Sequence, residues 1–137
     1  MIFSFSLIAI TGAIASLSNT LFPSTSLMEG LASDWDASAH YLLRLRGLHP
    51  LLGLLMGGSL ALTAWLSIQL IHPEETELIK RSRFVAIATS IGILFGLATL
   101  LMLAPIWMKL VHLTVAHSIW IFIVLWMREL RFKAATP

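Results

Sequence analysis

The sequence contains no cysteine among its 137 residues, and only 12% of its residues are charged. The lack of cysteine excludes disulfides, thiolate metal sites and thiol catalysis, because each of these needs a sulfur atom. A soluble domain carries about twice this share of charged residues. With 58% of its residues hydrophobic, the chain is predicted to be an integral membrane protein. Its net charge of +2 comes mostly from the ends of apolar segments, so no nucleic-acid partner is expected.

Four apolar runs come close to the length of about 20 residues that a membrane-spanning helix needs. They cover roughly residues 2–20, 43–71, 84–104 and 106–127. Only helices and closed barrels satisfy their own backbone hydrogen bonds in a bilayer, and these runs are too long and too uniformly apolar for barrel strands. The sequence therefore predicts one all-α domain over residues 1–137, a bundle of four transmembrane helices in the lipid bilayer.

Basic residues near the ends of the runs indicate the orientation, because such residues favour the cytoplasmic side. One basic cluster lies between the second and third runs and another follows the fourth; they consist of Lys80, Arg81, Arg83, Arg128, Arg131 and Lys133. Both clusters fall on the same side of the predicted bundle. We therefore expect a multi-pass protein of a bacterial-type inner membrane with both termini in the cytoplasm. The first run has no basic residue before it, so we expect a retained span rather than a signal peptide.

The connection between the first two runs, on the outer side, contains a candidate helix at residues 26–32. Ser26 and Glu29 have the spacing of a capping box, in which each residue satisfies a free backbone N–H group at the start of a helix. A short amphipathic helix is expected here, lying in the membrane interface.

Glycines follow a small-xxx-small pattern in the second and third runs, at Gly53 and Gly57 and at Gly92 and Gly96. This spacing lets neighbouring helices approach closely. The alternative is that the glycines leave room for a flat ligand beside the helices.

Two of the five histidines, His49 and His112, lie in apolar runs that both start on the outer side. At about 1.5 Å per residue, each lies roughly 10 Å inside the outer surface. Two imidazoles at matched depth are what bis-histidine ligation of a heme between helices requires. The alternative is that each ring makes a hydrogen bond to a neighbouring helix.

Arg44 and Arg46 precede His49 at the outer interface. Arginine binds carboxylates in a bidentate manner, so both side chains are candidates for heme propionates. Their alternative role is anchoring in the interface, or pairing with Asp34 or Asp36.

The remaining histidines have weaker claims to a heme. His40 lies in the outer connection and His72 at the inner end of the second run, and both are expected to be solvated. His117 lies about 140° further round the helix than His112, so we expect it to form a hydrogen bond in the bundle interior rather than ligate the same iron.

Three stretches carry a resemblance to a known family: ITGAIASLSNTLFPSTSLMEGLA, HYLLRLRGLHPLLGLL and LATLLMLAPIWMKLVHLTVAHSIWIFIVLW. In this order they resemble the carboxyl-terminal half of bacterial heme A synthase. The resemblance implies an eight-helix family built from two four-helix halves, in which His49 and His112 correspond to the ligands of heme b. It further implies heme O as substrate, whose ring methyl is oxidised to the formyl group of heme A.

The expected function is therefore that of a half-size, heme-binding member of this family, an oxidoreductase of heme A biosynthesis and cytochrome oxidase assembly. It would act as a homodimer or with a second four-helix half. The family's catalytic half has a glutamate shortly before its first histidine, whereas residues 43–46 here are Leu-Arg-Leu-Arg. This difference favours the alternative of a non-enzymatic cytochrome b that relays electrons or holds heme for oxidase assembly. A third alternative is a structural subunit whose histidines bond only within the bundle.

Overall fold

The computed structural model describes residues 2–135, and every element within them is a helix. The elements are α1 (Ile2–Leu21), α2 (Leu27–Trp35), α3 (Tyr41–Arg46), α4 (Leu48–Leu52), the π-helix η1 (Gly53–Gly57), α5 (Gly58–Ser67), α6 (Thr76–Leu101) and α7 (Ile106–Ala135). The predicted all-α class is thus confirmed for these residues. Met1, the last two residues and the side chain of Lys133 lie outside the described part.

Three helical segments of the described chain are long and apolar enough to cross a membrane. They are Tyr41–Ser67, which runs through α3, α4, η1 and α5, and then Thr76–Leu101 and Ile106–Phe132. The chain is therefore a multi-pass membrane protein. The apolar segment of α1, Phe5–Leu21, is shorter, so the predicted count of four crossing helices is not confirmed.

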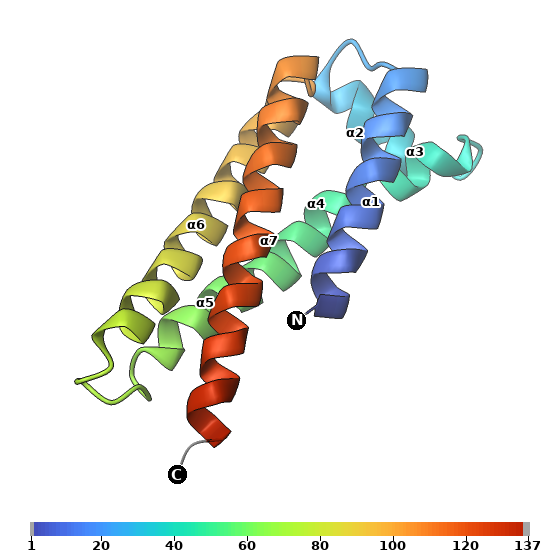
Figure 1. The fold of residues 1–137 in the computed structure, drawn as a ribbon. Helices are drawn as coiled ribbons and strands as arrows, with labels where there is room; N and C mark the ends of the chain where they lie inside the picture. Colours follow the sequence, from blue (N-terminus) through green and yellow to red (C-terminus); the bar gives the residue numbers. More distant parts are fainter. Residues whose placement is uncertain (1, 136–137) are drawn as a thin grey trace.

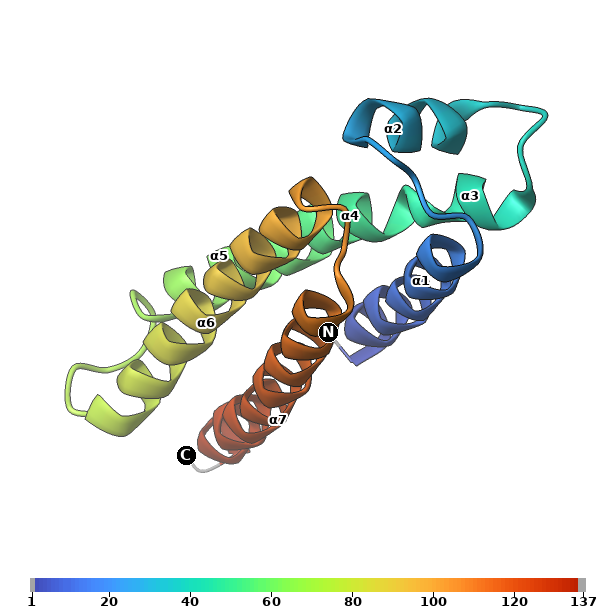
Figure 2. The ribbon, with the colours of Figure 1, turned by 90° about the horizontal axis from the view of Figure 1, so that it is seen from above.

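The long helices run alternately in opposite directions (Figure 1). The connection between α5 and α6 and the last residues of α7 lie toward one end, while α2 and the turn between α6 and α7 lie toward the other. Helix α6 packs between α5 and α7, and α1 packs against α3, α4 and η1. Viewed from above, α2 lies beside α3 at one side of the molecule, and α3 lies between α2 and α1 (Figure 2).

The core lies between α5, α6 and α7 and is small for a chain of this length. It is formed by Ala64, Leu78, Val85, Ala86, Ile119, Ile123 and Trp126. The indole nitrogen of Trp126 donates a hydrogen bond of 2.8 Å to the hydroxyl of Ser82, and both residues are buried. Most large apolar side chains instead face outward, as expected where lipid replaces water as the surrounding medium.

Glycines allow the close approach of α6 to its two neighbours. A Cβ atom at Gly92 would lie 2.8 Å from Cδ1 of Ile119 on α7, and one at Gly57 would lie 3.1 Å from Cδ1 of Ile93. At these two positions the small-xxx-small prediction of helix packing is confirmed. Gly53 differs, because a Cβ atom there would meet nothing within 4 Å.

The predicted helix in the outer connection is confirmed, and its cap is partly as expected. Ser26 is the N-cap of α2, and its hydroxyl accepts a hydrogen bond of 3.2 Å from the backbone N–H of Glu29. The Glu29 carboxylate reaches one residue further back than a capping box requires, and accepts bonds from the backbone and hydroxyl of Thr25. These bonds, led by that of the Thr25 hydroxyl, lower the pKa of Glu29 below its ordinary value of 4.5.

The basic cluster between the second and third runs is helical. Helix α6 begins at Thr76, so Lys80, Arg81 and Arg83 lie on its first turns rather than in a loop. Arg81 forms an ion pair of 3.0 Å with Glu129 on α7. The two basic clusters thus lie side by side on neighbouring helices, as the antiparallel pairing of α6 and α7 requires.

Candidate functional site

His49 on α4 and His112 on α7 face each other across the interior. Their ring centroids lie 6.4 Å apart, and the ring planes stand at 74°. Both residues are partly buried. The structure thus brings together the two histidines that sequence spacing placed at the same depth.

The His49 ring lies against α1. The hydroxyl of Thr11 approaches Nδ1 of His49 at 3.5 Å, the long limit of a hydrogen bond. Thr11 donates its own hydrogen to the backbone carbonyl of Leu7 at 2.9 Å. Its oxygen can therefore accept a hydrogen from Nδ1, and a ring that donates there would keep its lone pair on Nε2.

The His112 ring lies against α6. It lies next to Phe95, with ring centroids 6.2 Å apart and planes at 23°. Its Nδ1 is buried without a hydrogen-bond partner among the described residues. A buried polar atom left in this way costs about 1–3 kcal/mol, and such an atom needs an explanation in a native structure.

The helix that carries His49 changes its winding immediately after the histidine. The π-helix η1 follows α4 and is bounded by Gly53 and Gly57. A π-turn adds a residue to the helical repeat and is frequent at functional sites. His49 can therefore face α1 and α7 while Ala64, further along the same helix, is fully buried against the core.

The residues present suit an iron porphyrin. His49 and His112 are the residues that would hold its iron, because imidazole is a common ligand of heme iron and the two ring centroids lie 6.4 Å apart. The nitrogens at hand are Nε2 of His49 and a nitrogen of His112 that has no protein partner among the described residues. The porphyrin supplies the other four ligands, so two histidines suffice.

The site does not suit a bare metal ion. Nowhere in the described chain do three or more His, Cys, Asp or Glu residues come together to hold one. The expectation of a metal-binding protein in that ordinary sense is therefore wrong, because two imidazoles alone leave a protein-held metal under-coordinated.

The two arginines have different environments. Arg46 is only 6% exposed and forms an ion pair of 2.7 Å with Asp34. Its guanidinium donates hydrogen bonds to Asp34, Asn19, Phe22, Ser24, Gly30 and Ser33. These bonds use all five N–H donors of the guanidinium. The geometry therefore favours pairing with Asp34, the alternative to propionate binding. Arg44 is exposed and lines a hollow of about 410 Å³ beside Tyr41.

The other histidines lie away from the pair. His40 is the N-cap of α3, where its Nδ1 accepts a bond of 3.2 Å from the backbone of Leu42. His72 is exposed in the connection between α5 and α6. His117 bonds the carbonyl of Leu113 on its own helix at 2.8 Å and is exposed. Its predicted place in the bundle interior is wrong, because it faces outward.

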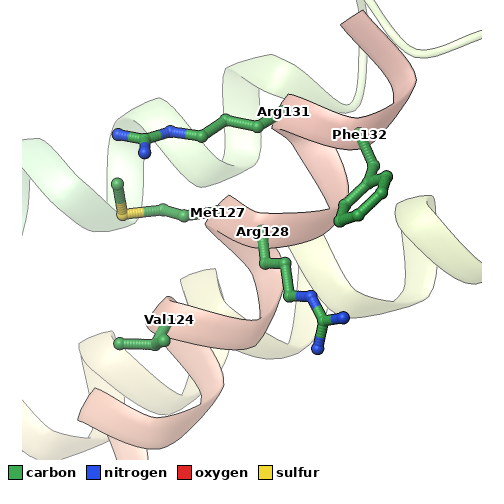
Figure 3. Close-up of a pocket in the computed structure, with 5 residues that line it drawn as sticks. All are labelled: Val124, Met127, Arg128, Arg131 and Phe132. Carbon is green, nitrogen blue, oxygen red and sulfur yellow. The ribbon is translucent and has the colours of Figure 1, made fainter. Parts of the chain in front are cut away.

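A second hollow, of about 270 Å³, lies at the opposite end of α7 from His112. It is lined by Val124, Met127, Arg128, Arg131 and Phe132 (Figure 3). Arg128 lies 5.6 Å from the ring of Phe132, a cation–π contact. This hollow is remote from the facing histidines.

Sequence reasoning missed the residues that surround the imidazoles on the neighbouring helices. Thr11 and Gly12 meet His49, and Phe95 meets His112. Gly96 had been noted only for its spacing, yet it meets His112. A small residue on a neighbouring span at the depth of each histidine was the available signal.

Comparison with known proteins gives two relatives. No family model and no solved structure matches the chain. Proteins named protoheme IX farnesyltransferase from two strains of Thermus thermophilus are 31% and 30% identical to it over 118 residues, which is 85% of this chain. The same match covers 19% of each relative. The chain spans about one fifth of their length.

These relatives overturn the expected family. They are named for farnesyl transfer to protoheme IX, whereas the motifs pointed to heme A synthase. The predicted oxidation of heme O, the place in heme A biosynthesis and the oxidoreductase class are therefore wrong. So is the alternative of a non-enzymatic cytochrome b that relays electrons or holds heme for oxidase assembly. The physical reason is that the motifs mark histidines in apolar helices, which suit a porphyrin iron but do not specify the reaction at the porphyrin edge.

Proposed function

We propose that this chain forms a membrane-embedded unit that binds an iron porphyrin between His49 and His112. The observation that carries this proposal is the 6.4 Å separation of the two imidazoles, which face each other from α4 and α7. The name of the two relatives supports it independently, because protoheme IX is an iron porphyrin. The expected heme b is the same iron protoporphyrin, and we propose it as the ligand.

The roles of the chain's own residues follow from their positions. His49 and His112 would each hold the porphyrin iron through a ring nitrogen when the porphyrin is bound. The apolar helices α4, α6 and α7 exclude water from these nitrogens. Arg44, the exposed one of the two arginines, is the candidate partner of a propionate at the outer interface, because a guanidinium binds a carboxylate with paired hydrogen bonds.

We further propose that α1 is the fourth crossing of a single four-helix domain, with both termini in the cytoplasm. The end that carries the α5–α6 connection also carries Arg81, Arg83, Arg128 and Arg131, which the cytoplasmic side favours. Pairing with a second copy or a further four-helix unit remains a prediction.

We do not propose farnesyl transfer as an activity of this chain alone. The facing histidines support porphyrin binding, and no described contact in this chain bears on a farnesyl donor. We therefore propose that these helices bind the porphyrin. The transfer reaction named for the relatives is assigned to the relatives as whole proteins, of which the match covers 19%.

The test is titration of the full chain in lipid nanodiscs with hemin, followed by optical and electron paramagnetic resonance spectra. We expect one hemin per chain and the low-spin signature of two axial imidazoles. His49→Ala and His112→Ala should each lose that signature and bind hemin at least about tenfold more weakly. His117→Ala is the matched control on α7 and should bind normally.

Two results would overturn the assignment. One is a wild-type chain that takes up no hemin while its circular dichroism shows folded helices. The other is an unchanged low-spin spectrum in both His49→Ala and His112→Ala. Pyridine extraction of the pigment from protein purified without added hemin would identify the porphyrin, and a type other than protoheme would refute the proposed ligand.

A further inference from the structure

Each of the two facing imidazoles lies directly against a glycine of a neighbouring helix. A Cβ atom built on Gly12 of α1 would lie 2.9 Å from Cε1 of His49. A Cβ atom built on Gly96 of α6 would lie 2.8 Å from Cε1 of His112. Real Cβ atoms do not approach other heavy atoms this closely, so neither ring can keep its place if its glycine gains a side chain.

The two contacts repeat the same arrangement in both halves of the chain. In each, a glycine on one long helix faces a histidine on the next long helix, first from α1 to α4 and then from α6 to α7. Neither glycine has a positive φ, so backbone conformation does not explain them. Glycine in a helix interior is unfavourable relative to alanine, and the room it leaves for the imidazole is the compensating gain.

Rigidity distinguishes these contacts from ordinary packing. The atom that faces Gly92 is Cδ1 of Ile119, the far end of a flexible chain that moves aside by changing a rotamer. The atoms that face Gly12 and Gly96 belong to planar rings, which turn only as a whole about two side-chain torsions. A methyl group at Gly12 or Gly96 must therefore re-aim the ring nitrogens.

Thr11 adds a second constraint on His49. Its hydroxyl gives its hydrogen to the carbonyl of Leu7, and its oxygen faces Nδ1 of His49 at 3.5 Å. A hydrogen bond from Nδ1 to this oxygen holds the ring in the tautomer whose Nε2 lone pair is free. Residues that orient a ligating histidine in this way commonly change metal affinity by about 10–100-fold when replaced.

We propose that Gly12 and Gly96, assisted by Thr11, are positioning residues that aim the two imidazoles at a shared iron. This inference rests on the proposed porphyrin binding, which it deepens by naming what orients the ligands. None of these residues touches the porphyrin iron; they act through the histidines.

The chain provides matched control variants, because other helical glycines differ only in what they face. Gly12→Ala and Gly96→Ala are the test variants. Gly53→Ala introduces a methyl group into open space, and Gly92→Ala introduces one against Ile119 on the same helix as Gly96. All four remove the same backbone freedom, so differences between them report on the histidine contacts.

Hemin titration in nanodiscs should separate the variants into two groups. We expect about tenfold or weaker hemin binding and a shifted low-spin spectrum for Gly12→Ala and Gly96→Ala. Gly53→Ala and Gly92→Ala should stay within about twofold of the wild type. Equal losses in Gly92→Ala and Gly96→Ala would overturn the positioning role, because general packing would then explain both. Normal binding in both test variants would overturn it as well.

A second measurement needs no porphyrin and separates this inference from the proposed function. Nitrogen-15 spectra of histidine-labelled apoprotein in nanodiscs report the tautomer of each ring. We expect the Nδ1–H tautomer for His49, and its loss in Thr11→Val. Persistence of that tautomer in Thr11→Val would refute the role of Thr11 even if hemin binds. If the wild type binds no hemin but Thr11→Val shifts the tautomer, the proposed function fails while the positioning contact stands.

Discussion

Replacing Arg46 by alanine is the substitution whose effect on the free energy of unfolding can be estimated most directly from the structure. Arg46 links the end of α1, through Asn19, to α2, through Gly30 and Ser33. Its ion pair with Asp34 has both side chains under 10% exposed, at 7% and 9%. The residue therefore holds α2 over the end of the bundle that lies nearest His49.

The size of the loss in unfolding free energy depends on the polar groups that lose their partner when Arg46 is removed. Truncating Arg46 strands the buried Asp34 carboxylate, and breaking a buried ion pair in this way costs about 3–5 kcal/mol. The backbone carbonyl of Gly30 loses its bond from Arg46 but keeps the bond of 2.8 Å from the Ser33 hydroxyl, so it adds little. We therefore expect the free energy of unfolding to fall by about 3–5 kcal/mol.

The assay is SDS-driven unfolding followed by circular dichroism, with hydrogen exchange of the α2 amides to detect local opening. Arg44→Ala is the control, because Arg44 is two residues away and exposed; we expect a change within about 0.5 kcal/mol. Asp34→Asn combined with Arg46→Ala should cost less than the sum of the single changes, by about 2 kcal/mol. Equal effects of Arg44→Ala and Arg46→Ala, or strict additivity of the pair, would refute the reasoning.

Three further predictions use the same chain. Trp126→Phe strands the buried Ser82 hydroxyl and should lower unfolding free energy by about 1–3 kcal/mol in SDS unfolding, while the exposed Trp107→Phe should change it little. Arg81→Ala should cost less than Arg46→Ala in that assay, because the Arg81 side chain is 49% exposed whereas that of Arg46 is 7% exposed; an equal loss would contradict the weaker role of the Arg81–Glu129 pair. Because the pKa of Glu29 is lowered from 4.5 by bonds from Thr25, its carboxylate should stabilise α2 above pH 4.5, and this should be lost as pH falls through the lowered folded pKa; hydrogen exchange of α2 should show this acid opening, and Glu29→Gln should reduce its pH dependence, leaving the part due to Asp36 at the C-cap of α2.

Local features were predictable because they depend on neighbours in the chain. The cap at Ser26 and the helix that follows it needed only the spacing of Ser26 and Glu29. The all-α class followed from apolar runs that only helices satisfy in lipid. The third apolar run was placed at residues 84–104, whereas α6 begins at Thr76, because hydropathy does not detect the charged first turns of a helix.

The function expected from the motifs was wrong for a related reason. The residues around His49 and His112 suit the porphyrin iron that we propose for these apolar helices. They contain no information on the chemistry at the porphyrin periphery, which other residues must carry. The relatives named for protoheme farnesylation share the macrocycle with the predicted family but not the reaction.

Composition and hydropathy were enough to identify a helical membrane protein, and residue numbers were enough to place two histidines at equal depth, because spacing along a helix sets depth. The side-chain contacts could be read only from the folded chain: Arg46 meets Asp34, and the two imidazoles meet Gly12 and Gly96. Each of these contacts joins two different helices. Its geometry depends on how the helices pack and on the π-turn at Gly53–Gly57, which no local spacing specifies.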